Sequence, residues 1–251
     1  MLEVESDGPI LRLTLARPEV RNALNDGLID LLSEAFSNLP PGTRCVTITG
    51  AGTAFCAGGD LEWMRKAASY TEEQNFEDAM RIARLWESIS RCPAAVIARV
   101  NGHAFGGGCG LVSAADAAVA ADGSLFAFSE PRLGLIPATI SRVVIDKIGR
   151  GHSRALFATG ETFDASRALC MGLVHEVVAP DELDAAVTKK IRSVLACGPE
   201  AVASSKRLAL DPPGTLEEAS RLLAATRSGD EAKEGISAFL GKRRAAFFVE
   251  A

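Results

Sequence analysis

Two glycine-rich turns are the first features of this chain whose residue types and spacing could do chemistry. One contains Gly58-Gly59, and the other contains Gly106-Gly107-Gly108 directly before a small, apolar segment typical of a closely packed helix. Glycine costs about 1 kcal/mol against alanine inside a helix, so three in a row need a reason. Bare amides at a helix N-terminus could face an anion or a developing oxyanion. Tight helix packing or a flexible loop explains the three glycines equally well.

Glu130 is the carboxyl group that could transfer protons to a ligand bound at these turns. It follows Phe126 and Phe128 closely in a mostly apolar stretch. A carboxyl group in apolar surroundings should have a raised pKa, and it could then exchange protons near neutral pH. The alternative is a glutamate that caps a helix or pairs with Arg132 or Arg142.

Other familiar site motifs are incomplete. A dinucleotide-binding GxGxxG would begin at Gly106 and Gly108, but Leu111 stands where its last glycine should be. Residues 151–155 come close to the GxSxG nucleophile motif, but they follow an expected helix rather than a strand. The P-loop pattern is missing, and the three histidines are far apart in the sequence. We therefore expect neither a serine nucleophile nor a metal site.

Length and composition exclude several classes of protein. The 251 residues are 47% hydrophobic, which supports a sizeable core, and the net charge of −5 disfavours non-specific nucleic-acid binding. The sequence contains no apolar run of about 18 residues, so we expect no membrane partner. Its acidic start lacks the apolar core of a signal peptide, and its six cysteines form no CxxC pair. These features predict a cytoplasmic protein with buried, reduced thiols.

The elements that must position the two turns follow from hydrophobic periodicity. Each glycine-rich turn comes after a short apolar strand, and we expect Asn22 to cap the first helix. The expected strands are 9–16, 44–49, 95–100, 117–121, 125–128 and 173–178. The expected helices are 22–37, 74–90, 138–149, 152–160, 165–171, 181–196, 199–208, 215–228 and 230–243. Strand–turn–helix units followed by helices alone predict an α/β core with a helical C-terminal segment.

Together, these motifs resemble the crotonase (enoyl-CoA hydratase/isomerase) superfamily. Residues 55–61 (FCAGGDL), 101–109 (NGHAFGGGC), Asp116 and 130–137 stand in the order and spacing of the family's motifs. Further stretches that resemble its signatures are 16–24, 172–174 and 234–239. The resemblance therefore covers nearly the whole chain.

The resemblance implies an α/β fold built as a spiral of repeated ββα units with a helical trimerisation region. The core with the acyl-CoA site would be residues 1–197, and the oligomerisation segment would be residues 198–251. Members of the family form homotrimers, often paired into hexamers, and their ligand is an acyl-CoA thioester. Coenzyme A enters as part of the substrate, so neither a separate cofactor nor a metal is implied.

The resemblance also implies roles for individual residues. Glu130 would be the catalytic acid and base, and the amides of Gly59 and Gly107 would form the oxyanion hole. The implied substrate- and CoA-binding residues are Arg21, Ala57, Gly58, Asp60, Leu61, Gly106, Gly108, Gly110 and Lys242. Lys242 would reach the CoA of a neighbouring subunit. Many members have a lysine at the position of Glu62, so one phosphate contact is expected to be missing or moved.

Gly110 is the chain's important departure from the family pattern. Hydratases of the family typically carry one glutamate at this position and a second at that of Glu130. General acid–base catalysis is worth roughly 10²–10⁴-fold, so losing the first glutamate could cost hydration several orders of magnitude. Proton shuttling in a Δ3,Δ2-enoyl-CoA isomerase needs only one base. On this chemistry alone, an isomerase would lead.

A second resemblance favours hydration. Residues 107–112 and 133–141 resemble the methylglutaconyl-CoA hydratase-like branch, in which glycine also occurs at the first position. We therefore predict an enoyl-CoA hydratase-like enzyme that works through an oxyanion-stabilised enolate. An isomerase is the first alternative; other thioester chemistry and a non-catalytic acyl-CoA binder follow. Side chains that could line an acyl tunnel, but whose spacing is also typical of a core, are Trp63, Met64, Phe76 and Trp86.

Overall fold

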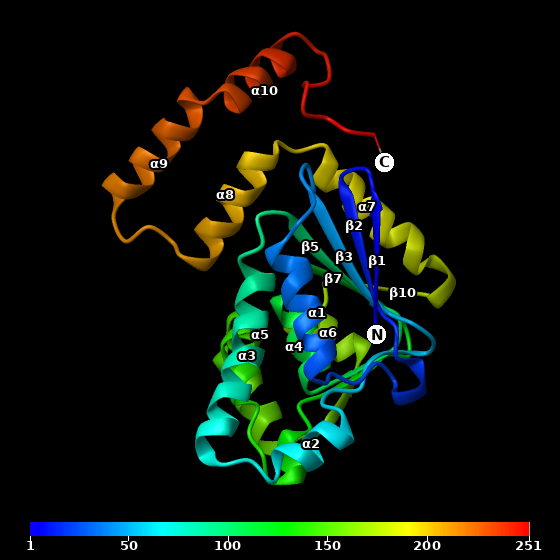
Figure 1. The fold of residues 1–251 in the computed structure, drawn as a ribbon. Helices are drawn as coiled ribbons and strands as arrows, with labels where there is room; N and C mark the ends of the chain where they lie inside the picture. The colour runs from blue at the N-terminus through cyan, green and yellow to red at the C-terminus, as the bar shows by residue number, and fades with distance from the viewer. Residues whose placement is uncertain (251) are drawn as a thin grey trace.

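Two sheets form the centre of the molecule (Figure 1). The structure is a computed structural model, and it describes residues 1–250. The larger sheet has the strand order β1-β2-β3-β5-β7-β10, and the smaller one has the order β4-β6-β8-β9. The strands are β1 (Leu2–Asp7), β2 (Ile10–Leu15), β3 (Cys45–Gly50), β4 (Ala54–Cys56), β5 (Ala95–Val100), β6 (His103–Phe105), β7 (Ala117–Ala121), β8 (Leu125–Ala127), β9 (Thr162–Asp164) and β10 (Glu176–Val178).

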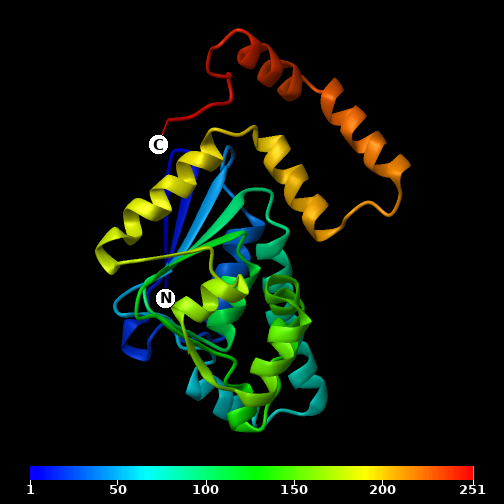
Figure 2. The same cartoon turned by 180° about the vertical axis from the view of Figure 1, so that it is seen from behind.

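Helices cover both faces of the larger sheet and form the C-terminal part of the chain (Figures 1 and 2). They are α1 (Asp26–Ser37), α2 (Leu61–Ala67), α3 (Glu72–Ser90), α4 (Gly107–Ala114), α5 (Ala138–Thr159), α6 (Ala165–Met171), α7 (Leu183–Leu195), α8 (Pro199–Leu210), α9 (Leu216–Ser228) and α10 (Asp230–Leu240). Non-helical backbone at Gly149 interrupts α5, which agrees with the two shorter helices expected there.

Three successive segments of the chain follow one path through the two sheets. Each starts with a strand in the larger sheet, continues with a three-residue strand in the smaller sheet, and ends in helix. The segments are β3-β4 with α2 and α3, β5-β6 with α4, and β7-β8 with α5. Because the strands β3, β5 and β7 pair in parallel, each helix must carry the chain back before the next strand. This repeated ββα path confirms the predicted fold class.

The central strands read as apolar runs because both of their faces are covered. In β5, five of the six residues are buried, and Ile97 lies opposite Ala117 of β7. β1 differs, since it pairs antiparallel at the edge of the sheet and none of its residues is buried. Its apolar alternation is limited to Leu2 and Val4, and three of its six residues are acidic, which is why the sequence did not predict it.

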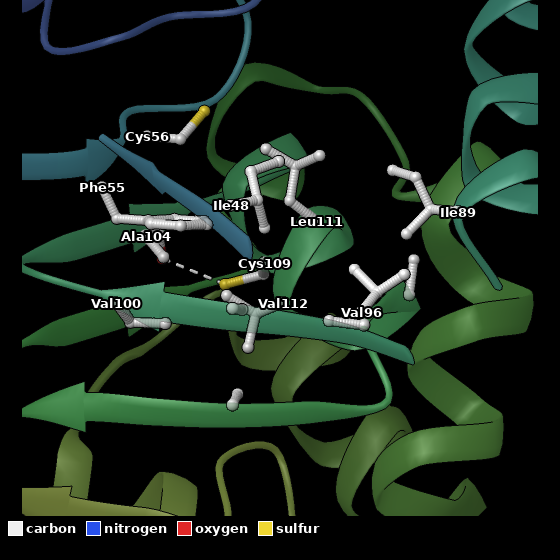
Figure 3. Close-up of a cluster of buried hydrophobic side chains, with 14 of the residues drawn as sticks. Ile48, Phe55, Cys56, Ile89, Val96, Val100, Ala104, Cys109, Leu111 and Val112 are labelled. Carbon is white, nitrogen blue, oxygen red and sulfur yellow. Dashed lines mark hydrogen bonds between the residues drawn. The ribbon is translucent and has the colours of Figure 1, made fainter. Parts of the chain in front are cut away.

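The main core lies between the larger sheet and the helices α1, α3 and α4. In Figure 3, Leu111 and Val112 of α4 pack among side chains from the strands, and the Cys109 thiol points to Ala104. Cys109 Sγ donates to the carbonyl oxygen of Ala104 at 3.0 Å. A second buried cluster joins the other face of the sheet to α7, for example Ile97 to Ile191. The main core holds α4 in place, because the buried side chains of this helix belong to it.

Two local predictions were wrong. Helix α1 is capped by Asn25, whose side chain accepts from the amide of Leu28, and not by Asn22. Asn22 instead lies buried at φ 58°, and its amide group donates to the carbonyls of Ala51 and Ala54. The thiols are all free, but Cys170 and Cys197 are exposed, so only four of the six are buried as predicted.

Candidate functional site

One cavity of about 990 Å³ brings most of the predicted site residues together. We call it the reaction cavity. Its walls come from the turn before α1, the segment from β4 into α2, one side of α3, the start of α4 and the segment from Glu130 into α5. The predicted residues that line it are Arg21, Ala57, Gly58, Gly59, Asp60, Leu61, Gly106, Gly107 and Glu130.

The two glycine-rich turns lie directly against each other. Gly58 has φ 93°, and a Cβ placed on it would lie 2.9 Å from the carbonyl oxygen of Phe105. Leu24 holds the first turn from the opposite side through two backbone hydrogen bonds. Its amide donates to the carbonyl oxygen of Gly58 (2.7 Å), and its carbonyl oxygen accepts from the backbone amide of Asp60 (2.8 Å). In this parallel bridge, the amide of Gly59 points away from Leu24.

Two backbone amides of these turns are left without an acceptor. Within residues 1–250, neither the amide of Gly59 nor that of Gly107 donates a hydrogen bond. Gly107 is the first residue of α4, where helix amides have no partner in the preceding turn and carry the positive end of the helix dipole. Since both glycines line the reaction cavity, this wall can stabilise an oxygen that gains negative charge.

The glycines at the start of α4 also allow close packing. A Cβ on Gly107 would lie 2.8 Å from Cδ1 of Leu24, and one on Gly108 would lie 2.4 Å from the carbonyl oxygen of Cys56. Gly106 has φ 48°, and its Cβ would lie 3.2 Å from Oε1 of Glu130. Tight packing and exposed amides, which the sequence left as alternatives, therefore occur together.

Glu130 begins a short 3₁₀ turn and is half-buried. Its Oε2 is buried and has no hydrogen-bond partner in the described part of the chain. The alternative that Glu130 forms an ion pair is wrong within residues 1–250: Arg132 donates to Oγ1 of Thr162, and neither Arg132 nor Arg142 pairs with Glu130. Burial raises the pKa of Glu130 above its usual value. This carboxyl group can therefore bind and release a proton closer to neutral pH.

The side chain of Asp60 lines the cavity but is already engaged. Its Oδ2 lies 2.8 Å from Nη2 of Arg17, and its Oδ1 accepts from the amides of Glu62 and Trp63 at the start of α2. Burial opposes the charge, but the hydrogen bonds from Arg17 and the two amides hold the pKa of Asp60 below its usual value. Asp60 therefore anchors the Gly58-Gly59 turn by pairing with Arg17 and capping α2.

The space beside Gly110 is filled by apolar side chains. A Cβ on Gly110 would lie 2.6 Å from Cγ2 of Ile140 and 3.3 Å from Cζ2 of Trp86. Both side chains are 2% exposed. A glutamate at this position would need Ile140 to move, because a branched side-chain methyl lies in its path. The reaction cavity thus offers no ready place for a second carboxylate at Gly110.

Three predicted site residues do not line the reaction cavity. Gly108 and Gly110 are buried beneath its floor, and Lys242 is exposed on the C-terminal segment with φ 51°. Contact of Lys242 with the CoA of a neighbouring subunit stays a prediction. Among the proposed tunnel side chains, Trp63 and Trp86 line the cavity together with Met64, whereas Phe76 is 59% exposed outside it.

Sequence reasoning missed the residues that brace the site. The sequence placed Arg17 and Leu24 within an N-terminal signature, but it predicted neither the ion pair with Asp60 nor the bridge to Gly59. Ile140 had no predicted role of its own, although its side chain closes the space beside Gly110. A signal existed only for Arg17, as a cation that stands beside a chain-breaking proline.

The described residues contain neither a cluster typical of a metal site nor a helix suited to span a membrane. Residues 1–250 contain no group of three or more histidine, cysteine, aspartate or glutamate side chains placed to hold a metal ion. Across the same residues, no helix combines the length and the apolar character that crossing a membrane requires.

Comparisons with known proteins identify relatives over nearly the whole chain. The family model described as enoyl-CoA hydratase/isomerase matches residues 5–249. A crotonyl-CoA hydratase of Syntrophomonas wolfei is 31% identical over 97% of this chain and 96% of its own length. The solved structure of an enoyl-CoA hydratase from Mycobacterium smegmatis is 36% identical, covers 98% of both chains and superposes with a TM-score of 0.91. Pseudomonas aeruginosa AtuE, 33% identical with 98% coverage of both chains, gives 0.94.

Proposed function

The chain belongs to the enoyl-CoA hydratase/isomerase family, the crotonase superfamily, and we propose that it adds water to a 2-enoyl-CoA thioester, or removes it. Hydratase is the activity named for its relatives, including the crotonyl-CoA hydratase of Syntrophomonas wolfei. The observation that carries the proposal is the meeting, in one cavity, of two amides without acceptors and a carboxyl group whose Oε2 has no partner within residues 1–250.

The proposed role of the two amides is to bind the thioester oxygen. The carbonyl oxygen accepts from Gly59 and Gly107, and it gains negative charge when the enolate forms. Both amides are held before substrate arrives, Gly59 by the bridge to Leu24 and Gly107 by the start of α4. Removing one such donor from an enzyme typically costs about 10²–10³-fold in kcat.

Glu130 is the proposed acid and base of both proton transfers. Its carboxylate takes a proton from water while the water oxygen bonds to C3 and the C2=C3 electrons move into the enolate. The carboxylic acid so formed then gives its proton to C2, the enolate collapses to the thioester, and Glu130 is again a carboxylate. The raised pKa of Glu130 suits a group that must both accept and donate within one turnover.

A second function, Δ3,Δ2-enoyl-CoA isomerisation, is favoured by one observation. Ile140 and Trp86 fill the space beside Gly110, where a hydratase of this family would hold a second carboxylate to position water. Glu130 alone could take the C2 proton from a 3-enoyl thioester and return it to C4 through the same stabilised enolate. This reaction needs no ordered water.

The experiment that separates these functions is mass spectrometry of an enoyl-CoA panel in heavy water. The panel contains short, branched and carboxylated 2-enoyl- and 3-enoyl-CoA thioesters. Addition of one molecule of water to a 2-enoyl-CoA supports hydration, and the best substrate then gives the acyl class. Deuterium uptake with a shifted double bond and no added water supports isomerisation instead. Unchanged substrates throughout would contradict both functions and favour an acyl-CoA binder.

The proposed path of coenzyme A runs along the first glycine-rich turn. Arg21 is exposed at the cavity mouth with φ 53°, and Leu61, which also lines the mouth, is 76% exposed. Both could contact the pantetheine and nucleotide of a bound thioester. Coenzyme A would arrive as part of the substrate, and the proposed chemistry needs no other cofactor. The cytoplasmic location stays a prediction.

We propose that residues 198–251 form an oligomerisation segment, as a homotrimer or a pair of trimers requires. Helices α8 to α10 extend away from the two sheets (Figures 1 and 2). They expose large apolar side chains, among them Leu216 (89%), Phe239 (82%) and Leu240 (74%). Exposed apolar surface of this kind commonly marks an interface. Light scattering tests the proposal: a monomeric wild-type protein at micromolar concentration would contradict it.

A further inference from the structure

A second cavity, of about 720 Å³, adjoins the reaction cavity. Its walls come from α3, α4, α5 and α8. The two cavities share two lining residues, Trp86 of α3 and Thr139 of α5. A volume of this size is ordinary for a small-molecule pocket, which spans about 300–1,000 Å³. The described residues therefore place a sizeable space directly behind the wall that contains Trp86.

Trp86 is the main barrier between the two spaces. It is a large side chain, it is only 2% exposed, and it lines both cavities. Its Cη2 would lie 4.0 Å from a Cβ on Gly107 and 3.4 Å from a Cβ on Gly110. The indole ring thus stands close to the amide proposed to bind the thioester oxygen. An acyl chain that leaves the carbonyl carbon in this direction meets the ring within a few bonds.

The space behind Trp86 suits an alkyl chain next to the ring. The apolar side chains that line only the second cavity include Met80, Ala83, Ala114, Ala115, Ala138, Val143 and Leu210. Several of these are alanines, which leave room rather than fill it. The lining also contains charged side chains: Arg84 and Arg142 are exposed, whereas Lys147 and Lys206 are half-buried. Both ammonium groups are already engaged, because each donates to a backbone carbonyl and Lys206 also pairs with Asp116 at 2.7 Å.

We propose that Trp86 is the partition that closes the reaction cavity against the second cavity and so sets the length of acyl chain accepted in that direction. The inference rests on the proposed function, because it assumes that the acyl group of a thioester lies beside Gly107. Trp86 then selects short or compact acyl groups, and a smaller side chain at this position joins the two cavities into one longer tunnel.

The test compares Trp86→Leu with Trp63→Leu, which is matched because Trp63 lines only the reaction cavity. Two readouts use acyl groups of 4, 8 and 12 carbons: calorimetric binding of saturated acyl-CoA and turnover of 2-enoyl-CoA. A single methylene in an apolar pocket is worth about 10–200-fold in discrimination. We expect Trp86→Leu to raise the C12-to-C4 ratio of affinity or kcat/KM at least about 10-fold, and Trp63→Leu to change it much less.

A further pair of variants keeps the test decisive if Trp86→Leu does not fold. Trp86→Phe keeps a ring and opens the partition less, so the ratio should rise by a smaller factor. The second variant adds Ala83→Phe to Trp86→Phe. The new ring fills space from the side of the second cavity, so the C12-to-C4 ratio should return toward the wild-type value. Folded Trp86 variants with an unchanged ratio would overturn the inference.

The two readouts separate failure of this inference from failure of the proposed function. If the wild type binds acyl-CoA but turns over no enoyl-CoA, the function is wrong, and the binding ratios still decide the role of Trp86. If turnover occurs and the ratios do not respond to Trp86, only the partition is wrong. A wild-type protein that binds none of the acyl-CoA probes overturns both.

Discussion

Two walls of the reaction cavity meet at α4, and they differ in what fills the space that a glycine leaves. One wall contains Glu130; the other, which we call the Gly110 wall, consists of the Ile140 and Trp86 side chains that cover the buried Gly110. Beside Gly106 lies a carboxyl oxygen of Glu130, 3.2 Å from where a Cβ would stand. Beside Gly110 lies a methyl group of Ile140, at 2.6 Å, with the indole of Trp86 behind it. Glycine thus makes room for an acid on one wall. One helical turn away, it makes room for the apolar side chains of Ile140 and Trp86, which we call the apolar plug.

Because of this difference, only one wall of the site carries a group that can exchange protons. Protons can be exchanged on the Glu130 wall, next to the amide of Gly107, whereas the Gly110 wall can only shape the space. An enzyme with carboxylates on both walls could hold water between them. In the proposed mechanism a single carboxyl group does the work of both, so changes at Glu130 should affect activity strongly.

The largest expected effect comes from removing the acid on the Glu130 wall. Glu130→Gln keeps the size and polarity of the side chain but cannot accept and return a proton. Turnover should fall about 10²–10⁴-fold, the usual worth of a general acid–base group, while the affinity for a saturated acyl-CoA stays nearly unchanged. Steady-state kinetics and calorimetric titration measure the two quantities.

The matched control for that loss is Glu34→Gln, an exposed glutamate on α1 outside the cavity lining. It should leave both turnover and affinity at the wild-type level. Wild-type turnover by Glu130→Gln would show that another group moves the proton, and the contrast between the two walls would then have no catalytic meaning.

A smaller effect is expected from placing an acid on the Gly110 wall. Gly110→Glu must displace Ile140, and overpacking a well-packed core typically costs about 1–3 kcal/mol. Burying a carboxylate without a partner adds to that cost. Thermal unfolding should therefore show a lower Tm for Gly110→Glu than for Gly110→Ala, which meets the same methyl group without a charge.

Hydration should not increase in Gly110→Glu, because Ile140 keeps the carboxylate from the position a hydratase needs. Adding Ile140→Ala should recover part of the lost stability by making room. A Gly110→Glu protein that is as stable as the wild type and faster in hydration would mean that the apolar plug yields easily.

The mildest effect is a pH dependence of stability. The pKa of Glu130 is raised by burial, so the folded state binds its proton more tightly than the unfolded state. The folded state therefore loses stability as pH rises from the ordinary glutamate pKa, about 4.3, through the raised value. Glu130→Gln lacks this loss. Its Tm relative to the wild type should rise between about pH 4 and pH 7.

A flat Tm difference over that pH range would show that Glu130 ionises as freely as an exposed glutamate. The Glu34→Gln variant, measured in the same buffers, removes any effect that comes from replacing an arbitrary carboxylate. Agreement between Glu34→Gln and the wild type at each pH is the condition for interpreting the Glu130 result.

The sequence predicted the larger elements of the fold because they carry periodic apolar patterns. The strands at 95–100 and 117–121 match β5 and β7 residue for residue. The three-residue strands β4, β6 and β9 are too short to show any period, and the sequence analysis missed them. The family resemblance supplied the spiral of ββα units, which periodicity alone had left as an α/β core.

The sequence predicted those features of the candidate site that depend on neighbouring residues, but not those that depend on packing between distant segments. Glycine runs indicated free amides at the two turns, and the family resemblance assigned them to Gly59 and Gly107. Apolar neighbours predicted the raised pKa of Glu130. The plug beside Gly110 depends on Trp86 and Ile140, which come from two other helices. Whether these side chains fill the space beside Gly110 depends on tertiary packing, which the sequence does not give. The two cavities on either side of Trp86 also depend on that packing.

The most direct test of the central claim, that Glu130 alone transfers the proton at C2, is proton NMR of but-2-enoyl-CoA incubated with the protein in heavy water. The wild type should place one deuterium at C2 of the hydrated product, and Glu130→Gln should lower that rate by at least about 10²-fold. Deuterium incorporation by Glu130→Gln at the wild-type rate would contradict the account.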